Sequence, residues 1–383
     1  MMEVNFAASF FEWYAGEAMR MNGDVLPNAE PQNRRLIIKQ PVGVCGLITP
    51  WNFPIGMITR KLGPALAAGC SAVLKPSEET PLTALAFAKI AEQAGMPAGL
   101  FNVVTASREN TDRVGSAICD SDIVKKISFT GSTRVGKLLY ERSASNVKRV
   151  SMELGGNAPF MVFNSANAKL AAQKAVQSRF RNTGQTCVCA ERLFVQEGIY
   201  DEFVAELKAA VSELKMGDPL DTSTTQSAVI NQRALDSIAE KVDEAVASGA
   251  TIEMGGKRAE GQGSSLYYEP TIITDCKIDM KVFKEEIFGP VVPIVKFQSE
   301  SVGLLMANAH STGLAGYIMT NDMAQIWRVS EQLEVNYTTL KSVLNTTSLK
   351  HYTIENWCSF SFTWGERKYK KVENESGYQK IYC

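Results

Sequence analysis

Short β-branched runs alternate with helical stretches between residues 42 and 156, and this alternation constrains the fold more than any other feature of the chain. The predicted strands are residues 42–48, 71–74, 101–104, 126–129 and 149–154. Apolar strands that are joined through helices are typical of a parallel sheet covered on both faces. The sequence therefore predicts an α/β fold built on a parallel sheet that is covered on both faces.

One helix in this region has clear end signals. Thr80 is a natural N-cap, Pro81 suits the first turn, and Gly95 predicts the end of the helix. Its apolar residues recur at the i, i+3, i+4, i+7 spacing of a buried face. The predicted buried stripe consists of Phe87, Ile90, Ala91 and Ala94.

The chain of 383 residues is long enough for two or three domains. A second α/β stretch is expected from strands near 159–163 and 192–196 and a helix over 200–214. Residues 23–41 combine polar turns with a short strand, which predicts a projecting hairpin. From residue 336 onward the composition becomes aromatic and loses periodicity. We expect domains over 1–153 and 154–335, followed by a divergent tail over 336–383.

Composition excludes several classes of function. Lys and Arg number 40 against 41 Asp and Glu, so a nucleic-acid partner held by phosphate neutralisation is not expected. The longest apolar run is too short for the roughly 20 residues of a membrane-spanning helix. Only two histidines occur and no Cys-x-x-Cys, so no metal site is expected. Eight scattered cysteines fit a reducing compartment, and the N-terminus shows neither a signal nor a transit sequence.

A glycine turn at Gly131-Ser132 joins a predicted strand to a predicted helix. Such a turn presents backbone N–H groups and the positive end of the helix to a phosphate, although many are only tight connections. The same stretch nearly matches the P-loop pattern G-x-x-x-x-G-K-S/T of nucleotide triphosphatases. Leu138 stands where that pattern requires a metal-binding hydroxyl, so this alternative is weak.

Cys187 follows Gly-Gln-Thr in a predicted loop and is a candidate nucleophile, because thiolates attack carbonyl carbons well. The alternative is a buried structural cysteine, which is the more common state of a free thiol. Glu153 precedes two glycines and could supply the base, or could be an ordinary glutamate at the end of a strand. The cysteines assigned to structural roles are Cys45, Cys70, Cys119 and Cys276.

Taken together, these motifs resemble the aldehyde dehydrogenase superfamily over roughly residues 1–335. The matching stretches, in the order the family has them, are 50–54, 75–78, 129–132, 153–156, 184–187 and 286–290. The residues around Arg60 and Cys187 are most similar to the branch that oxidises succinate semialdehyde. The resemblance implies a Rossmann-type cofactor domain, a catalytic domain and a small β arm for oligomerisation.

The resemblance also implies a mechanism. Cys187 would attack the aldehyde carbon, and the oxyanion would be held by the amide of Asn52 and the backbone N–H of Cys187. Hydride transfer to the nicotinamide would leave a thioester, and Glu153 would deprotonate the water that hydrolyses it.

NAD is the expected cofactor and NADP the less favoured one, because Glu78 would accept from ribose hydroxyls and repel a 2′-phosphate. Lys75, near it, would soften that repulsion. The residues expected to bind the cofactor are Trp51, Lys75, Pro76, Ser77, Glu78, Gly131, Ser132, Gly136, Glu286 and Phe288.

Arg60 and Arg181 stand where relatives acting on neutral aldehydes carry aromatic side chains, so they would bind the distal carboxylate of succinate semialdehyde. The alternative is that each makes an ordinary surface contact. Cys189 lies two residues after Cys187, and a disulfide between them would block the nucleophile, although the spacing is at the limit of disulfide geometry.

By resemblance the partners would be an aldehyde and further copies of the chain, with no nucleic acid or membrane. The compartment would be the mitochondrial matrix or else the cytoplasm. The family's final pairing strand is not found in 336–383, so low activity and broken oligomers are expected. An aldehyde dehydrogenase of other substrate range, or an impaired chain acting as a scaffold, remains the alternative.

Overall fold

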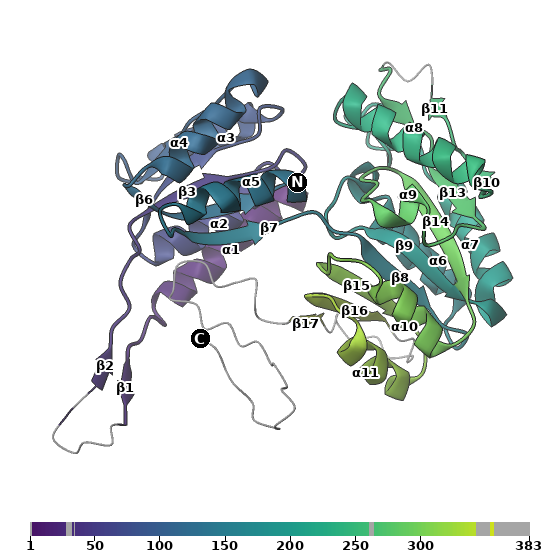
Figure 1. Ribbon diagram of the computed structural model, residues 1–383. Helices are drawn as coiled ribbons and strands as arrows, with labels where there is room; N and C mark the ends of the chain where they lie inside the picture. The colour runs from purple at the N-terminus through teal and green to yellow at the C-terminus, as the bar shows by residue number, and fades with distance from the viewer. Residues whose placement is uncertain (1, 28–32, 34, 260–263, 342–352, 356–383) are drawn as a thin grey trace. The chain divides into compact units, whose positions relative to one another are not determined.

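The computed structural model describes residues 2–27, 33, 35–259, 264–341 and 353–355. It divides into two compact units, Met1–Leu154 and Gly155–Asn356, each with its own sheet (Figure 1). The division falls one residue after the boundary expected at 153, and the second unit extends beyond residue 335.

The first unit is built on a five-stranded parallel sheet in the order β5-β4-β3-β6-β7. Its strands are β3 Val44–Ile48, β4 Ser71–Lys75, β5 Phe101–Val103, β6 Val124–Thr130 and β7 Arg149–Glu153. The chain enters at β3, builds outward through β4 and β5, then returns to β6 on the other side of β3. This reversal creates a switch point between β3 and β6, where α/β sheets bind ligands.

Helices cover both faces of this sheet, which confirms the predicted α/β fold. They are α1 Met2–Ala18, α2 Gly56–Ala67, α3 Pro81–Gln93, η1 Arg108–Asn110, α4 Thr111–Asp120 and α5 Thr133–Ala144. Leu47 packs with Ile58 and Leu62 of α2 in one buried cluster, whereas its neighbour Ile48 packs with Ile118 of α4 in another. Alternate residues of β3 therefore enter opposite cores, as a pleated strand requires.

The buried stripe of α3 differs from the predicted one. Ala84 and Ala91 are buried, and Phe87 packs between Phe11 and Phe101, but Ile90 is 58% exposed. The predicted i, i+3, i+4, i+7 spacing is correct, but the buried stripe begins at Ala84 and not at Phe87. A run of apolar residues fits more than one helical register, so the sequence alone did not fix the starting residue.

The hairpin predicted over 23–41 is present as β1 Asp24–Leu26 paired antiparallel with β2 Arg35–Ile37. Val25 and Leu36, which lie opposite each other, are both exposed.

The second unit contains an eight-stranded sheet in the order β10-β13-β14-β9-β8-β15-β16-β17. Its strands are β8 Ala158–Val162, β9 Ala190–Gln196, β10 Thr251–Met254, β13 Thr271–Thr274, β14 Val291–Phe297, β15 Ala315–Met319, β16 Tyr337–Lys341 and β17 Thr353–Glu355. The six inner strands run parallel, and the two edge strands, β10 and β17, pair antiparallel. A separate small ladder joins β11 Arg258–Ala259 to β12 Tyr267–Tyr268.

The helices of the second unit are α6 Ala168–Arg179, α7 Tyr200–Ser212, α8 Gln232–Ala247, α9 Lys281–Lys284, α10 Glu300–Asn308 and α11 Met323–Gln332, with the 3₁₀ turns η2 Arg181–Gly184 and η3 Glu197–Ile199. Polar side chains cap several N-termini, for example Asn167 on α6 and Asp322 on α11. One core cluster packs α6 and α7 on the sheet, and a second includes side chains of α8 to α11.

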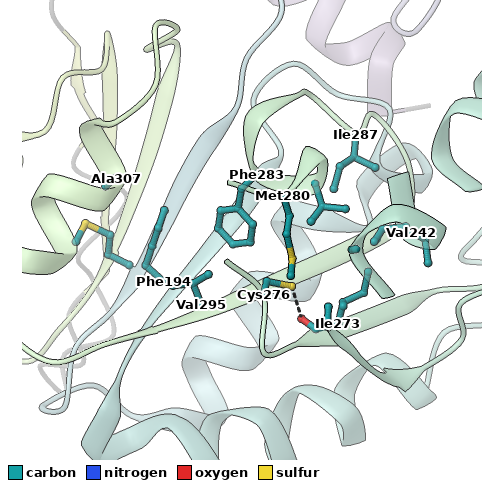
Figure 2. Packing of buried hydrophobic residues seen from close by; sticks show 14 of the residues in the cluster. Phe194, Val242, Ile273, Cys276, Met280, Phe283, Ile287, Val295 and Ala307 are labelled. Atoms are coloured by element: carbon teal, nitrogen blue, oxygen red, sulfur yellow. Dashed lines mark hydrogen bonds between the residues drawn. The ribbon is translucent and has the colours of Figure 1, made fainter. Parts of the chain in front are cut away.

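Figure 2 shows part of this second cluster, in which Phe194 of β9 meets Phe283 of α9 edge-on with ring centroids 5.7 Å apart. Ile287 also belongs to the cluster and is almost fully buried. The segment that follows α9 is therefore anchored in the core at Ile287.

The strands β16 and β17 lie in the segment expected to be a divergent tail. Five residues of β15 pair in parallel with five residues of β16, so residues 337–341 continue the sheet of the second unit. The side-chain pattern of this stretch gave no alternation from which the strand could be predicted. Within the described residues no helix is both long and apolar enough to cross a membrane.

Candidate active site

In the first unit, a cavity of about 470 Å³ opens beside the carboxyl ends of β3 and β4. One side is apolar, with Ile48, Val135, Leu138 and Leu139, and Lys75 adds a buried ammonium group. The remaining lining residues are Thr111, Asp112, Gly115, Ser116, Glu141 and Arg142. Apolar walls beside a few polar groups suit a flat heterocycle with a hydroxylated sugar.

Lys75 and Glu78 form an ion pair with 3.2 Å between Nζ and Oε2. Burial acts to raise the pKa of Glu78, but its own backbone N–H and the Lys75 ammonium hold the value below the usual range. Glu78 is therefore an ionised acceptor beside the cavity. This is the residue pair predicted to meet the adenosine ribose, and its chemistry fits that group.

The glycine turn between β6 and α5 is closely packed. The Ser132 hydroxyl accepts a hydrogen bond from the backbone N–H of Val135, so Ser132 is the N-cap of α5. A Cβ on Gly131 would lie 2.5 Å from the Phe129 ring, and one on Gly136 would lie 2.3 Å from Leu154. The close packing around this turn therefore requires glycine at both positions, and the turn leads into the N-terminus of a 12-residue helix.

Glu153 ends β7, and its backbone carbonyl accepts from Gly131, so the candidate base adjoins the glycine turn. Its side chain is partly buried. Trp51, Asn52 and Arg60 also belong to the first unit and are partly buried: the first two lie between β3 and α2, and Arg60 lies on α2.

Lys61, which the sequence analysis did not single out, is a fully buried lysine of the same unit. Burial lowers its pKa to about 7, while the negative charge of Glu153 acts in the opposite direction. Its Nζ donates to the Ser128 hydroxyl at 3.0 Å. The signal in the sequence was a second basic residue, directly after Arg60, in a helix whose other residues are mostly apolar. It places a proton-holding group within the electrostatic reach of Glu153.

The loop that carries Cys187 lies in the second unit, between α6 and β9. Asn182 and Thr183 adopt left-handed backbone angles with φ of 52° and 56°, which is uncommon for residues other than glycine. The Gln185 side chain accepts from the backbone N–H of Ile230 at 2.9 Å and donates to Asn182. These contacts fix the loop around Cys187, which is partly exposed, and Arg181 at its start is exposed.

Cys189 is buried, and its thiol donates to the Arg179 carbonyl at 3.5 Å. Burial raises its pKa to about 12. The four cysteines that were assigned to structural roles are all buried, as predicted: Cys45, Cys70, Cys119 and Cys276.

Gly155 and Gly156 bring the predicted cofactor residue Glu286 close to the loop that carries Cys187. The Glu286 carboxylate accepts from the backbone N–H of Gly156 at 3.1 Å. A Cβ on Gly156 would lie 2.2 Å from the carbonyl oxygen of Cys187, and one on Gly155 would lie 2.5 Å from Glu286. Side chains at either position would therefore separate these two groups.

Burial raises the pKa of Glu286 to about 8, and the nearby Glu191 carboxylate adds to this effect. Phe288, two residues on, has a left-handed φ of 54°. Among the described residues, no cluster of three or more His, Cys, Asp or Glu side chains could hold a metal ion.

The predicted site residues thus fall into two sets. The first unit holds Trp51, Asn52, Arg60, Glu153 and the residues beside the cavity, and the second holds Cys187, Cys189, Arg181, Glu286 and Phe288. Within each unit the structure brings together residues that are far apart in the sequence.

Comparison with known proteins gives a consistent result. The model of the aldehyde dehydrogenase family matches residues 1–350. The human mitochondrial succinate-semialdehyde dehydrogenase is 50% identical over 334 residues, which cover 87% of this chain and 62% of the relative. The NADP(+) succinate-semialdehyde dehydrogenase of Escherichia coli is 48% identical over 332 residues, covering 87% and 68%.

Among solved structures, the succinate-semialdehyde dehydrogenase of Burkholderia pseudomallei superposes with a TM-score of 0.86 at 46% identity, covering 90% of this chain and 70% of that one. The chain spans less than two thirds of the length of its human and mouse relatives, at 62% and 64%.

Proposed function

Since the chain belongs to the aldehyde dehydrogenase family, we propose that it oxidises succinate semialdehyde to succinate with a nicotinamide dinucleotide. The observation that carries the proposal is the identity of about half of the aligned residues to succinate-semialdehyde dehydrogenases, over 87% of the chain. The arginines Arg60 and Arg181, the candidate nucleophile and the candidate base are all present in this chain.

Cys187 is the nucleophile of the proposed reaction. Its thiolate attacks the aldehyde carbon and forms a thiohemiacetal, while the side-chain amide of Asn52 and the Cys187 backbone N–H donate to the oxyanion. The closely packed loop from Asn182 to Gln185 supports this role, because a nucleophile needs a fixed backbone to reach the carbonyl carbon in the right geometry.

Glu153 acts as the base in the second half of the reaction. It removes a proton from the water that hydrolyses the Cys187 thioester, which releases succinate and regenerates the thiol. Lys61 supports the role by keeping a buried group that can carry positive charge within electrostatic reach of the carboxylate.

A bound nicotinamide dinucleotide would supply the acceptor for the hydride that leaves the carbon attached to Cys187. Lys75 and Glu78 would hold its adenosine ribose, and the turn at Gly131 and Ser132 would receive its pyrophosphate. Two observations support this assignment: the cavity has apolar walls, and the Lys75 that lines it is paired with Glu78. Glu286 would accept from the second ribose, with Phe288 packed nearby.

We propose a preference for NAD over NADP. The ionised Glu78 would repel a 2′-phosphate, while Lys75 would lessen the repulsion, so a preference rather than exclusion is expected. One relative is named as an NADP(+) enzyme, which makes a comparison of kcat/KM with both cofactors necessary. An equal or higher kcat/KM with NADP would overturn this part of the proposal.

A redox switch between Cys187 and Cys189 is a further part of the proposal. Oxidation by a peroxide would form the disulfide with release of water, and a dithiol would reverse it. Because Cys189 is buried and hydrogen-bonded to Arg179, the loop has to move before the disulfide can form. Peroxide inactivation should lose its reversibility in Cys189→Ala.

The proposed partner is a further copy of the chain, in a homo-oligomer. The exposed Val25 and Leu36 on the β1–β2 hairpin support this, because isolated two-stranded ribbons are only marginally stable. The named compartment of the human and mouse relatives supports a mitochondrial location.

The test of the proposed function is the formation of reduced nicotinamide when purified protein receives succinate semialdehyde and NAD. Cys187→Ala should abolish turnover, whereas Cys276→Ala, a change at a buried cysteine of the core, should preserve it. A wild-type protein that melts cooperatively and binds NAD but gives no turnover would favour the scaffold alternative.

A further inference from the structure

A buried ion pair closes the base of the loop that carries Cys187. Arg179 is the last residue of α6 and Glu191 is the second residue of β9, so the two bracket this loop in the sequence. Their side chains are 0% and 1% exposed, and Arg179 Nη1 lies 2.6 Å from Glu191 Oε1. Charges are rarely buried so completely unless they are paired and hydrogen-bonded.

Both members of the pair also bind the backbone of a second loop, which follows Glu286. Arg179 donates to the carbonyl of Gly289 at 2.5 Å and to that of Val291 at 2.6 Å. Glu191 accepts from the backbone N–H groups of Ile287 at 3.1 Å and Phe288 at 3.2 Å. Four hydrogen bonds from one ion pair thus hold residues 287–291.

The second loop has a conformation that needs such support. Phe288 is left-handed, with φ of 54°, which costs energy for a residue with a side chain. Ile287, just before it, is buried in the core shown in Figure 2. The loop is therefore held from the core side by Ile287 and from the backbone side by Arg179 and Glu191.

The two loops also touch directly. Gly184, in the nucleophile loop, has φ of 76°, and a Cβ there would lie 2.1 Å from the carbonyl oxygen of Gly289. That carbonyl is one of the two that Arg179 binds. A displacement of the second loop would therefore be transmitted to the backbone three residues before Cys187.

We propose that Arg179 and Glu191 are positioning residues that couple the loop carrying Cys187 to the loop carrying Glu286, and thereby set cofactor affinity and nucleophile reactivity together. The cofactor part rests on the proposed function, in which Glu286 binds the cofactor. The nucleophile part rests only on the geometry of the second unit.

The charges around Glu286 are consistent with this role. The charged groups that act on its carboxylate are Glu191, Arg179 and Lys241, and the backbone N–H of Gly156 donates to it. Glu191 acts to raise the pKa of Glu286, and Arg179 acts to lower it. The double variant therefore removes two opposing charge effects on the Glu286 carboxylate together with the backbone hydrogen bonds of the pair.

The test compares two variants of the pair with one control. The double variant Arg179→Gln with Glu191→Gln removes both charges, so no unpaired charge is left in the interior. Arg179→Lys keeps the charge but loses the planar guanidinium fork that reaches two carbonyls and a carboxylate at once. Leu207→Ala, at a fully buried site on α7, is the control for a general loss of stability.

Three quantities are measured for each protein: the Kd for NAD by fluorescence titration, the rate at which iodoacetamide alkylates Cys187, and the Tm. We expect the Kd to rise on the order of tenfold in the double variant, as for the loss of a charge-assisted hydrogen bond, and less in Arg179→Lys. The alkylation rate should change in the same variants. Leu207→Ala should lower the Tm and leave both other quantities unchanged.

A double variant with a lower Tm but wild-type Kd and alkylation rate would show a purely structural role and overturn the proposal. So would the loss of cooperative unfolding in both pair variants. If the wild-type protein does not bind NAD, the proposed function fails, and the alkylation rates alone then decide whether the pair positions Cys187.

Discussion

At the scale of single residues, the proposed function assigns the choice of substrate to Arg60 and Arg181. Arg181→Ala should raise KM for succinate semialdehyde about 10- to 100-fold, because a charge-assisted hydrogen bond to the distal carboxylate is lost. KM for butanal, which has the same length and no carboxylate, should change little. Steady-state kinetics with both aldehydes measure the difference, and equal effects would mean that Arg181 makes only an ordinary surface contact.

Lys61 gives a prediction about stability and pH. Its pKa falls from 10.5 in the unfolded chain to about 7 in the folded protein, because burial disfavours the ammonium group. Between these values the unfolded chain binds more protons, so stability rises with pH. The destabilisation is complete below about 7 and disappears as the pH approaches 10.5.

Lys61→Met removes this contribution, which is worth at most about 5 kcal/mol. The stability of the variant relative to the wild type should therefore be greatest near neutral pH and should decline as the pH rises. Urea unfolding at a series of pH values measures it. A difference that stays constant with pH would contradict the lowered pKa of the buried Lys61.

The sequence singled out Cys187 and Glu153 as candidates because ordered motifs surround both residues. It did not identify Lys61, Arg179 or Glu191, because their importance lies in burial and in contacts with distant segments. Arg179 and Glu191 are 12 residues apart in the chain, yet they bind carbonyl and N–H groups more than 90 residues further on. Nothing in local sequence patterning reports such a contact.

At the scale of elements, close approaches of the backbone decide the geometry around Cys187. Gly156→Ala should lower stability by about 1–3 kcal/mol or more and alter the alkylation rate of Cys187, because the new Cβ would meet the Cys187 carbonyl. Urea unfolding and iodoacetamide kinetics measure both effects.

Gly115→Ala is the matched control for this substitution. Gly115 lies within α4, and a Cβ there would make an ordinary contact at 3.6 Å with Leu139. Alanine should therefore stabilise the helix by up to about 1 kcal/mol and leave Cys187 unaffected. If both substitutions had the same effect, the close approach at Gly156 would not be what fixes the loop.

The elements of the first sheet could be predicted because apolar strands and well-capped helices alternate. The register of α3 could not, since the side of the helix that faces the sheet depends on where Phe11 and Phe101 lie. β16 could not be predicted either, because it is stabilised by parallel pairing with β15 rather than by its own alternation.

At the scale of the whole molecule, the first unit has a parallel sheet and the second a largely parallel one, each with its own cores, and the candidate residues are divided between the two units. The α/β class and the order of the motifs were predictable from the sequence. The proposed mechanism uses residues of both units, since the candidate nucleophile Cys187 belongs to one unit and the candidate base Glu153 to the other.

A single-turnover experiment decides whether Cys187 forms a thioester that Glu153 then helps to hydrolyse. Glu153→Gln is mixed with succinate semialdehyde and NAD, quenched in acid, and analysed by intact-protein and peptide mass spectrometry. The account predicts one succinyl group on the peptide that contains Cys187, formed with one equivalent of reduced nicotinamide, because the thioester is made but its hydrolysis lacks a base. A protein that forms reduced nicotinamide without a succinyl group on Cys187, or that carries it on another residue, would contradict the account.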